Sequence, residues 1–209
     1  MNPIPARTTF YCLLIVLFGL SCSPPAQDYY HYPCFSGDYV NAVIEIPAGT
    51  NLKMEYHADR QAFLPDSIDG KVRYVNFLPY PANYGFIPST YMAQQRGGDG
   101  DPLDIVVIAE ALPSQSILET IPIATLRLLD DGEIDTKIIA VPADPKLRVI
   151  QATNYQDFVI HYDAARAILE NWFLSYKGIG RTELLGWNDE AFALATIKQW
   201  GAEGADVPD

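Results

Sequence analysis

The residues with the clearest chemical potential are three carboxylates in a glycine-rich turn, Asp99, Asp101 and Asp104. The turn leads into an apolar segment, residues 103–109, that we expect to be a strand. Two carboxylates about 4 Å apart repel each other by roughly 4 kcal/mol at an effective dielectric near 20. A hard divalent cation such as magnesium or calcium offsets this repulsion. For this turn taken alone, an acidic surface turn without a ligand is the simpler interpretation.

A second acidic turn changes that balance, because Asp130 and Asp135 bracket the connection of an expected β-hairpin. Lys137 follows two residues after Asp135, so strand alternation places both side chains on one face. A carboxylate beside an amine is either a surface ion pair, which contributes little stability, or a place where a metal meets a phosphate.

Three further charged residues lie in strands expected near the start of the domain. Glu45 lies within the β-branched segment 43–46, and Lys53 and Glu55 share one face of a strand at residues 52–56. The solvent-facing side of an edge strand and a functional site both explain such residues. Their spacing alone does not decide between these two interpretations.

Tyrosines accompany these charged segments. Tyr80 and Tyr84 lie in a segment rich in Pro, Gly and Asn, residues 78–90. Tyr176 and Lys177 end the apolar stripe of an expected helix, just before the stop signal Gly178. Each aromatic residue alone is more often a packing residue than a functional hydroxyl.

The expected elements are mainly strands before Asp144 and helices after it. That order predicts an α+β domain built on a small antiparallel barrel or sheet with helices outside. The expected elements are strands at residues 39–46, 52–56, 72–75 and 103–109, a hairpin of 121–129 with 137–141, and helices around 165–176 and 189–200.

Composition limits the partners of the chain. The 209 residues can form one domain with a sizeable core, and the net charge is -12. This acidity excludes nucleic acid as an expected partner, because a phosphate backbone requires a basic surface. A polyanion can still bind to an acidic protein when metal cations lie between the two.

The N-terminus is typical of a targeting signal. Residues 10–20 are apolar but fall short of the roughly 20 residues of a transmembrane helix. Leu20-Ser21-Cys22 then resembles a bacterial lipoprotein signal, in which Cys22 carries the lipid. An ordinary cleaved signal with a chance cysteine is the alternative. We expect a signal peptide at 1–21, a lipidated tether at 22–38 and the domain at 39–209.

The cysteine count agrees with this processing. Cys12 would leave with the signal and Cys22 would carry lipid, which leaves Cys34 without a partner. If Cys22 is not lipidated, a Cys22–Cys34 disulfide is open to the protein in an oxidising compartment.

Seven segments in order resemble the soluble family I inorganic pyrophosphatases, over roughly residues 39–200. The central match is Asp99-Gly100-Asp101-Pro102-Leu103-Asp104-Ile105, which resembles the family signature without a mismatch. The other segments are Ile44-Glu45-Ile46-Pro47, Lys53-Met54-Glu55, Val72-Arg73-Tyr74-Val75, Tyr80 to Gly85, Asp130 to Lys137 with Tyr176-Lys177, and Gly186-Trp187.

The resemblance implies a role for each matched residue. Asp101 would be the general base, and Tyr84 would touch the water network. The phosphates would be bound by Lys53, Arg73, Lys137, Tyr176 and Lys177, with Glu55 and Tyr80 close by. Several Mg²⁺ ions would be held by Asp99, Asp104, Asp135, Asp130 and Glu45.

The resemblance also implies a fold, an activity and a setting. The fold would be an OB-like five-stranded antiparallel barrel flanked by helices. The activity would be magnesium-dependent hydrolysis of pyrophosphate to two phosphates by a metal-activated water. Homo-oligomers are common in the family. Members of the family are normally cytoplasmic, whereas the lipoprotein-type signal implies a copy that is anchored at the bacterial cell envelope and faces the periplasm.

Two alternatives remain open at this point. The first is a non-catalytic lipoprotein that binds divalent cations or phosphate-rich polymers. The second keeps the hydrolytic chemistry but widens the substrates to short polyphosphates or nucleotides.

Overall fold

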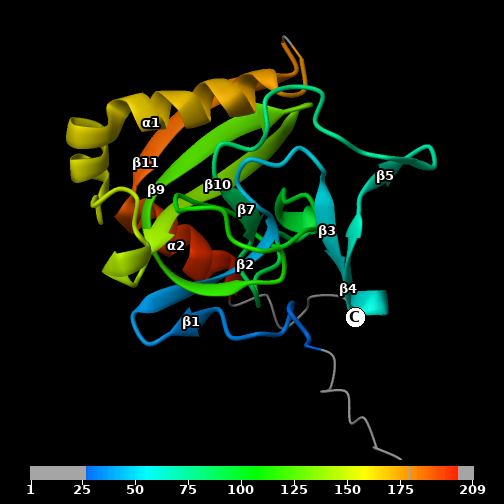
Figure 1. The fold of residues 1–209 in the computed structure, drawn as a ribbon, viewed down its shortest axis with the longest axis horizontal. Coiled ribbons are helices and arrows are strands. Elements are labelled where there is room, and N and C mark those ends of the chain that lie inside the picture. The colour runs from blue at the N-terminus through cyan, green and yellow to red at the C-terminus, as the bar shows by residue number, and fades with distance from the viewer. Residues whose placement is uncertain (1–26, 179, 202–209) are drawn as a thin grey trace, which may run out of the picture.

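The centre of the molecule is a seven-stranded sheet with the strand order β1-β2-β7-β8-β10-β9-β11 (Figure 1). We describe residues 27–178 and 180–201 of a computed structural model. The strands of this sheet are β1 Phe35–Ser36, β2 Tyr39–Ile46, β7 Asn83–Phe86, β8 Asp104–Val107, β9 Ile117–Asp130, β10 Glu133–Pro142 and β11 Thr182–Asp189.

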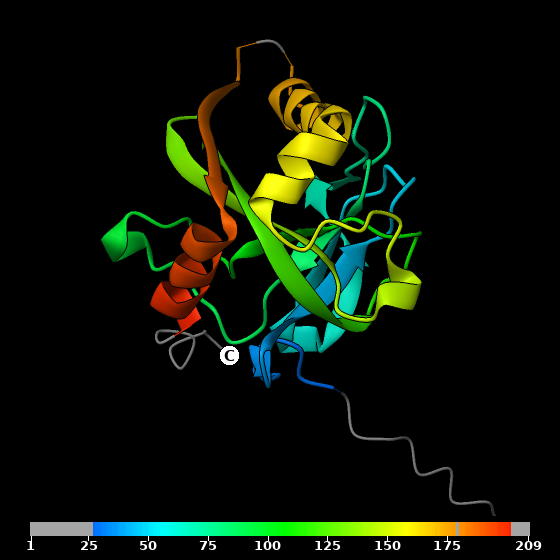
Figure 2. The same ribbon diagram turned by 90° about the vertical axis from the view of Figure 1, so that its left-hand side faces the viewer.

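Two short ladders lie beside this sheet, at the right of Figure 1. One pairs β3 Met54–His57 with β4 Ala62–Pro65, and the other pairs β5 Ser67–Ile68 with β6 Lys71–Val72. The α-helices are α1 Tyr155–Ser175 and α2 Glu190–Gly201. Figure 2 shows β11 running from the loop after α1 down into α2. Short 3-10 turns occur at Ala58–Arg60, Gln94–Arg96 and Pro145–Leu147.

The expected α+β class is confirmed, but the sheet differs from the expected barrel in two respects. It has seven strands instead of five: β1 and β11 lie at the two ends of the strand order, and a further pairing of β2 with β9 links β2, β7, β8, β10 and β9 in a ring. One pairing is parallel, because β10 runs alongside β8 in the same direction. The long strand β9 also pairs with β2 through its first residues, so the sheet is strongly curved.

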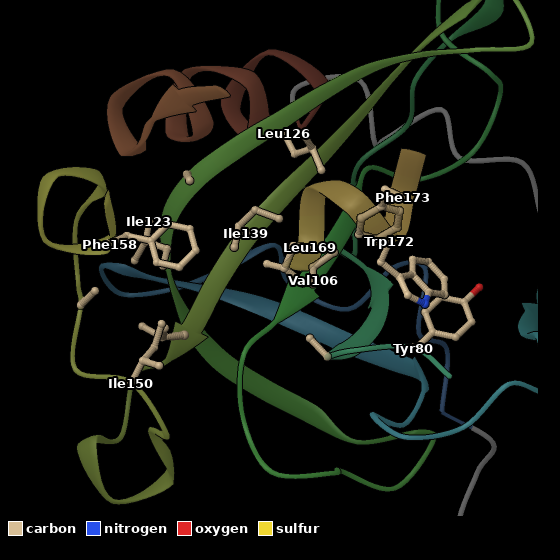
Figure 3. Packing of buried hydrophobic residues seen from close by; sticks show 14 of the residues in the cluster. Tyr80, Val106, Ile123, Leu126, Ile139, Ile150, Phe158, Leu169, Trp172 and Phe173 are labelled. Atoms are coloured by element: carbon tan, nitrogen blue, oxygen red, sulfur yellow. The ribbon is translucent and has the colours of Figure 1, made fainter. Parts of the chain in front are cut away.

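The centre of the sheet is buried on both faces. In β8 and β10, Val106 and Ile139 pack into one cluster with α1, whereas Ile105 and Ile138 pack into another with α2. Figure 3 shows the α1 side, where Trp172 and Phe173 lie near Tyr80. Complete burial of such a side chain contributes about 1.5–3 kcal/mol. Burial on both faces explains why these strands are continuous apolar runs.

The two helices and the hairpin form near their expected positions, although α1 begins at Tyr155, well before the expected start at residue 165. Asn154 caps α1, since its side chain accepts a hydrogen bond from the backbone N–H of Asp157 at 2.8 Å. In the hairpin, β9 and β10 are longer than expected, and their turn is only Asp131-Gly132. Both turn residues have positive φ, 49° and 95°, as a tight two-residue hairpin requires.

Strand β11 was missed by the sequence analysis. Gly186 interrupts it at a register shift, with φ at 135°, and so breaks the two-residue periodicity. The expected strand at residues 72–75 is also shorter in the structure, where β6 covers only Lys71–Val72.

The expected tether is partly described. Residues 1–26 lie outside the described residues, so the signal peptide, Cys22 and its lipid remain predictions. From Tyr29 onward the chain packs against the domain, and β1 pairs with β2. The folded region therefore begins before the expected boundary at residue 39. Within the described part of the chain, no helix is long and apolar enough to cross a membrane.

Candidate active site

All fourteen residues that were predicted to act at a site line one cavity of about 390 Å³. They are Glu45, Lys53, Glu55, Arg73, Tyr80, Tyr84, Asp99, Asp101, Asp104, Asp130, Asp135, Lys137, Tyr176 and Lys177. The structure thus brings together residues from β2, the short ladders, β7, β8, β10 and the end of α1. Their individual roles remain predictions.

One side of the cavity, the sheet wall, consists of Tyr84, Asp104, Asp135 and Lys137. Asp104 and Lys137 are register partners in the parallel pair β8–β10. The Nζ atom of Lys137 donates to Asp104 Oδ2 at 2.7 Å, to Asp135 Oδ1 at 2.9 Å and to Tyr84 Oη at 3.3 Å. The backbone ladder therefore fixes a cation between two carboxylates.

The charge of Lys137 is held by these carboxylates. Burial opposes ionisation of its amine, yet Asp104 and Asp135 raise the pKa of Lys137 well above its ordinary value. Burial raises the pKa of the Tyr84 hydroxyl, and Asp104 and Asp135 raise it further. At neutral pH the wall thus presents an ammonium ion and a neutral phenol.

The turn that carries Asp99 and Asp101 is shaped by glycines. Gly97 and Gly100 have φ values of 86° and 90°, which favour glycine. At Gly98 a side chain would collide with the carbonyl group of Met92. The backbone N–H of Asp101 donates to Asp99 Oδ1 at 3.0 Å, so the turn directs both carboxylates toward the cavity.

Burial and neighbouring negative charges disfavour the ionised form of the two carboxylates in this turn. Burial raises the pKa of Asp99 to about 6, and Asp104 and Asp101 add to the effect. Burial also raises the pKa of Asp101, and the charge of Asp104 adds to it. A divalent cation would relieve both the burial and the repulsion of these groups.

Glu45, on β2, is another carboxylate whose charged form is disfavoured by burial. Burial raises its pKa to about 8, although its Oε1 atom accepts a hydrogen bond from the backbone N–H of Tyr56 at 2.8 Å. The neighbouring strand contributes Gly85, where a side chain would collide with the carbonyl O of Val43. The close approach of β2 and β7 therefore depends on this glycine.

The opposite side of the cavity, the lateral arm, comprises residues 52–73. It presents the predicted Lys53, which forms an ion pair with Glu55, and the predicted Arg73. Both cations form ion pairs with Asp66, whose Oδ2 atom lies 3.0 Å from Arg73 Nη1 and 3.5 Å from Lys53 Nζ. Backbone hydrogen bonds link the same three residues, at 2.8 to 3.1 Å.

Asp66 is a residue that sequence reasoning missed. Burial alone would raise its pKa, but the hydrogen bond from Arg73 and the charge of Lys53 lower it below the usual range. Only the three-dimensional contact reveals this role, since an aspartate between two short strands forms no local motif.

The third side is formed at the end of α1 and the hairpin turn. Lys177 forms an ion pair with Asp130, and Thr182 Oγ1 lies 3.3 Å from the same carboxylate. Asp131, which was not predicted, lines the cavity and pairs with Arg181 at 2.8 Å. Burial raises the pKa of Tyr176 to about 12, so its hydroxyl stays protonated and can donate.

The chemistry of the carboxylates fits hard divalent metals, although their present arrangement is not a closed metal cage. Across residues 27–178 and 180–201, no group of three or more His, Cys, Asp or Glu residues already encloses a metal position. Lys137 lies between Asp104 and Asp135 instead. The raised pKa values of Glu45 and Asp99 nevertheless mark oxygen ligands that a cation would stabilise.

Comparisons with known proteins agree on one family. The family model described as inorganic pyrophosphatase matches residues 42–203. The chain is 35% identical to an inorganic pyrophosphatase of Synechocystis over 77% of this chain and 88% of the relative. It is 32% identical to one of Neisseria meningitidis, over 78% and 87%.

Solved structures show the same likeness. A type I inorganic pyrophosphatase from Toxoplasma gondii has a TM-score of 0.77 and 25% identity, covering 86% of this chain and 88% of that one. An inorganic pyrophosphatase from Thermus thermophilus has a TM-score of 0.71 and 27% identity, covering 86% and 99%.

Proposed function

The chain belongs to the inorganic pyrophosphatase family and is a phosphoanhydride hydrolase, and on this premise we propose that it hydrolyses pyrophosphate to two phosphates in a magnesium-dependent reaction. The observation that carries the proposal is the composition of the cavity, where four cations face a dense group of carboxylates. Pyrophosphate is a small polyanion that needs both the cations and metal ions held by the carboxylates.

The proposed metal ligands are carboxylates of the sheet wall, the glycine-shaped turn, the hairpin and β2. They are Asp99, Asp104, Asp130, Asp135 and Glu45. Bound magnesium neutralises phosphate charge and lowers the pKa of the attacking water. All-oxygen ligand sets of this kind suit magnesium.

The proton and the phosphates are handled by the chain's own residues. Asp101 accepts the proton of the nucleophilic water, and the water oxygen bonds to one phosphorus while the bridging oxygen leaves with the other phosphate. Asp101 suits this role because burial raises its pKa above the usual aspartate value, toward the working range of a general base.

The phosphate oxygens are bound from all three sides of the cavity. Lys53 and Arg73 act from the lateral arm, and Lys137, Tyr176 and Lys177 act from the other sides. These donors stabilise negative charge as it moves to the leaving phosphate. Lys137 now pairs with Asp104 and Asp135, and it would be free to donate to phosphate if those carboxylates held metal ions. Tyr80, Tyr84 and Glu55 orient the donors and the water.

The decisive test is phosphate release from pyrophosphate by the purified protein, with magnesium and with a chelator. Tripolyphosphate and ATP run alongside, because the cavity volume alone does not select between these substrates. Rapid, magnesium-dependent release selective for pyrophosphate supports the proposal. A folded protein that binds magnesium but releases no phosphate overturns it and favours the cation-binding alternative.

We also propose that the protein is lipid-anchored at Cys22 and faces the periplasm of a bacterium. The support is the apolar segment 10–20 followed by Leu20-Ser21-Cys22. Radiolabelled palmitate should enter the wild type and the control Cys34→Ser, but not Cys22→Ser. Labelling of Cys22→Ser would contradict the proposal. An oligomer is part of the same expectation, and sedimentation of the detergent-solubilised protein measures it.

A further inference from the structure

An aromatic turn upstream of the expected domain boundary lies against the active-site cavity. The turn is closed by Asp28, whose Oδ1 atom accepts from the backbone N–H groups of Tyr30 at 3.1 Å and His31 at 3.2 Å. The other carboxylate oxygen lies 2.8 Å from His31 Nδ1. Side-chain capping of this kind fixes a tight local conformation.

The turn places two tyrosine rings on the short β3–β4 ladder. Tyr29 contacts Tyr56 and Phe63 edge-on, with ring centroids 5.2 and 4.8 Å apart. Tyr30 contacts Tyr56 and Phe86 edge-on, at 4.9 and 5.1 Å. Edge-to-face pairs at these distances are favourable. The turn therefore connects β3 to β7 of the large sheet.

Hydrogen bonds extend this connection to the acidic centre. Tyr30 Oη donates to the carbonyl O of Tyr56 at 3.1 Å, and the backbone N–H of Tyr56 donates to Glu45 Oε1 at 2.8 Å. The backbone of Tyr56 is thus held on both sides. Ser89 fixes the turn in place, since its backbone N–H donates to the carbonyl O of Tyr30 at 2.7 Å.

The β3 strand needs such a contact. Among the described residues, β3 pairs with β4 and with no strand of the large sheet. Yet it carries Glu55 and directly follows Lys53, both at the cavity. Tyr30 lines the same cavity, and burial together with the charges of Glu45 and Asp101 raises its pKa. Its hydroxyl therefore remains a neutral donor over the working pH range.

We propose that Tyr30 is a positioning residue of the pyrophosphatase site, because its hydroxyl and ring hold the Tyr56 backbone that orients Glu45 and the Lys53–Glu55 pair. This inference rests on the proposed function. It adds a residue from the expected tether to the machinery of the site. The effect passes through Tyr56, so Tyr30 need not touch substrate.

The experiment compares Tyr30→Phe and Tyr30→Ala with Tyr39→Phe. Tyr39 is a suitable control because it begins β2, is 39% exposed and does not line the cavity. Each full-length protein is measured for kcat, KM for pyrophosphate, unfolding temperature and Mg²⁺ affinity by calorimetry. Calorimetry reports the position of Glu45 without any turnover.

Removal of the hydroxyl should weaken Mg²⁺ binding and raise KM, each by roughly threefold to tenfold, with little change in kcat. Tyr30→Ala should weaken Mg²⁺ binding and raise KM by more than tenfold each, because the ring contacts are lost as well. In both quantities Tyr30→Phe should therefore lie between the wild type and Tyr30→Ala. Tyr39→Phe should match the wild type in all four measurements.

Two results would overturn the inference. In the first, Tyr30→Phe binds Mg²⁺ and pyrophosphate like the wild type. In the second, Tyr30→Ala loses activity only in proportion to its unfolded fraction, which would indicate a purely structural role. If the wild type itself hydrolyses no pyrophosphate, the proposed function fails, while the Mg²⁺ titrations of the three variants still decide the role of Tyr30.

Discussion

The sheet wall and the lateral arm present the same kinds of charged group but are built in different ways. On the sheet wall, Lys137 is held by backbone pairing of β10 with β8, and its side chain is only 4% exposed. On the lateral arm, Lys53 and Arg73 lie outside long ladders and are 22% and 29% exposed. The comparison indicates that backbone pairing supports the sheet wall more firmly than the lateral arm. We expect the wall to fix metal ions and the arm to adapt to phosphate.

The largest effect is expected from Lys137→Met on the sheet wall. Removing the buried cation leaves the partly buried Asp104 and Asp135 without their partner, and breaking a buried pair in this way typically costs about 3–5 kcal/mol. The metal-free variant should therefore unfold at a much lower temperature, and Mg²⁺ should restore part of the loss. Calorimetric melting with and without Mg²⁺ measures this. Equal stability of the variant and the wild type would show that the sheet wall does not depend on its buried cation.

Asp101→Asn should affect catalysis without affecting the fold. Loss of a general base typically lowers kcat by about 10²–10⁴-fold, whereas the amide keeps the size and backbone contacts of Asp101. Phosphate release and circular dichroism measure the two effects. Asp163→Asn is the control, because Asp163 lies on α1 and does not line the cavity. Near-normal turnover by a folded Asp101→Asn protein would remove this residue from its proposed role.

Asp66→Asn tests the lateral arm. Arg73 and Lys53 would lose their shared carboxylate, so KM for pyrophosphate should rise by roughly threefold to tenfold, with a smaller change in kcat. The control is Asp69→Asn, an exposed position on the same arm whose φ of 53° asparagine tolerates. A fall in kcat with KM unchanged would contradict the division of labour between the two sides.

The smallest effect concerns the pH dependence of stability on the arm. The pKa of Asp66 is lowered in the folded protein, because the Arg73 and Lys53 contacts outweigh the effect of burial. Asp66 therefore stabilises the fold above the ordinary aspartate pKa, and this stabilisation is lost as the pH falls through the lowered value. Relative to wild type, Asp66→Asn should cost about 1 kcal/mol at pH 7. Melting curves at neutral and strongly acidic pH should show that difference shrinking, and a constant difference would exclude the ion pairs as its cause.

The sequence predicted the site better than it predicted the sheet. Asp99, Asp101 and Asp104 share one short turn, so their proximity is local information. The parallel pairing of β8 with β10 is different, because periodicity describes the faces of a strand but not its neighbours in space. For the same reason the α+β class could be predicted, whereas the strand count could not.

The residues that sequence reasoning missed act through distant contacts. Asp66 gains its role from Arg73 seven residues away, and Tyr30 from Tyr56, which lies 26 residues along the chain. Neither residue belongs to a motif that could have identified it. Cys22 is the reverse case, because its sequence pattern is informative while residue 22 lies outside the described part of the chain.

The long sequence distances across the cavity have a consequence for synthesis of the protein. Lys177 pairs with Asp130, 47 positions earlier, and Lys137 contacts Tyr84 across 53 positions. During translation the carboxylates of both acidic turns therefore emerge well before Lys177, the last cation of the cavity. The nascent chain carries an acidic group that is still short of a counter-charge until α1 has been made and has packed. Folding of this half of the cavity is completed only late, because long loops must close first.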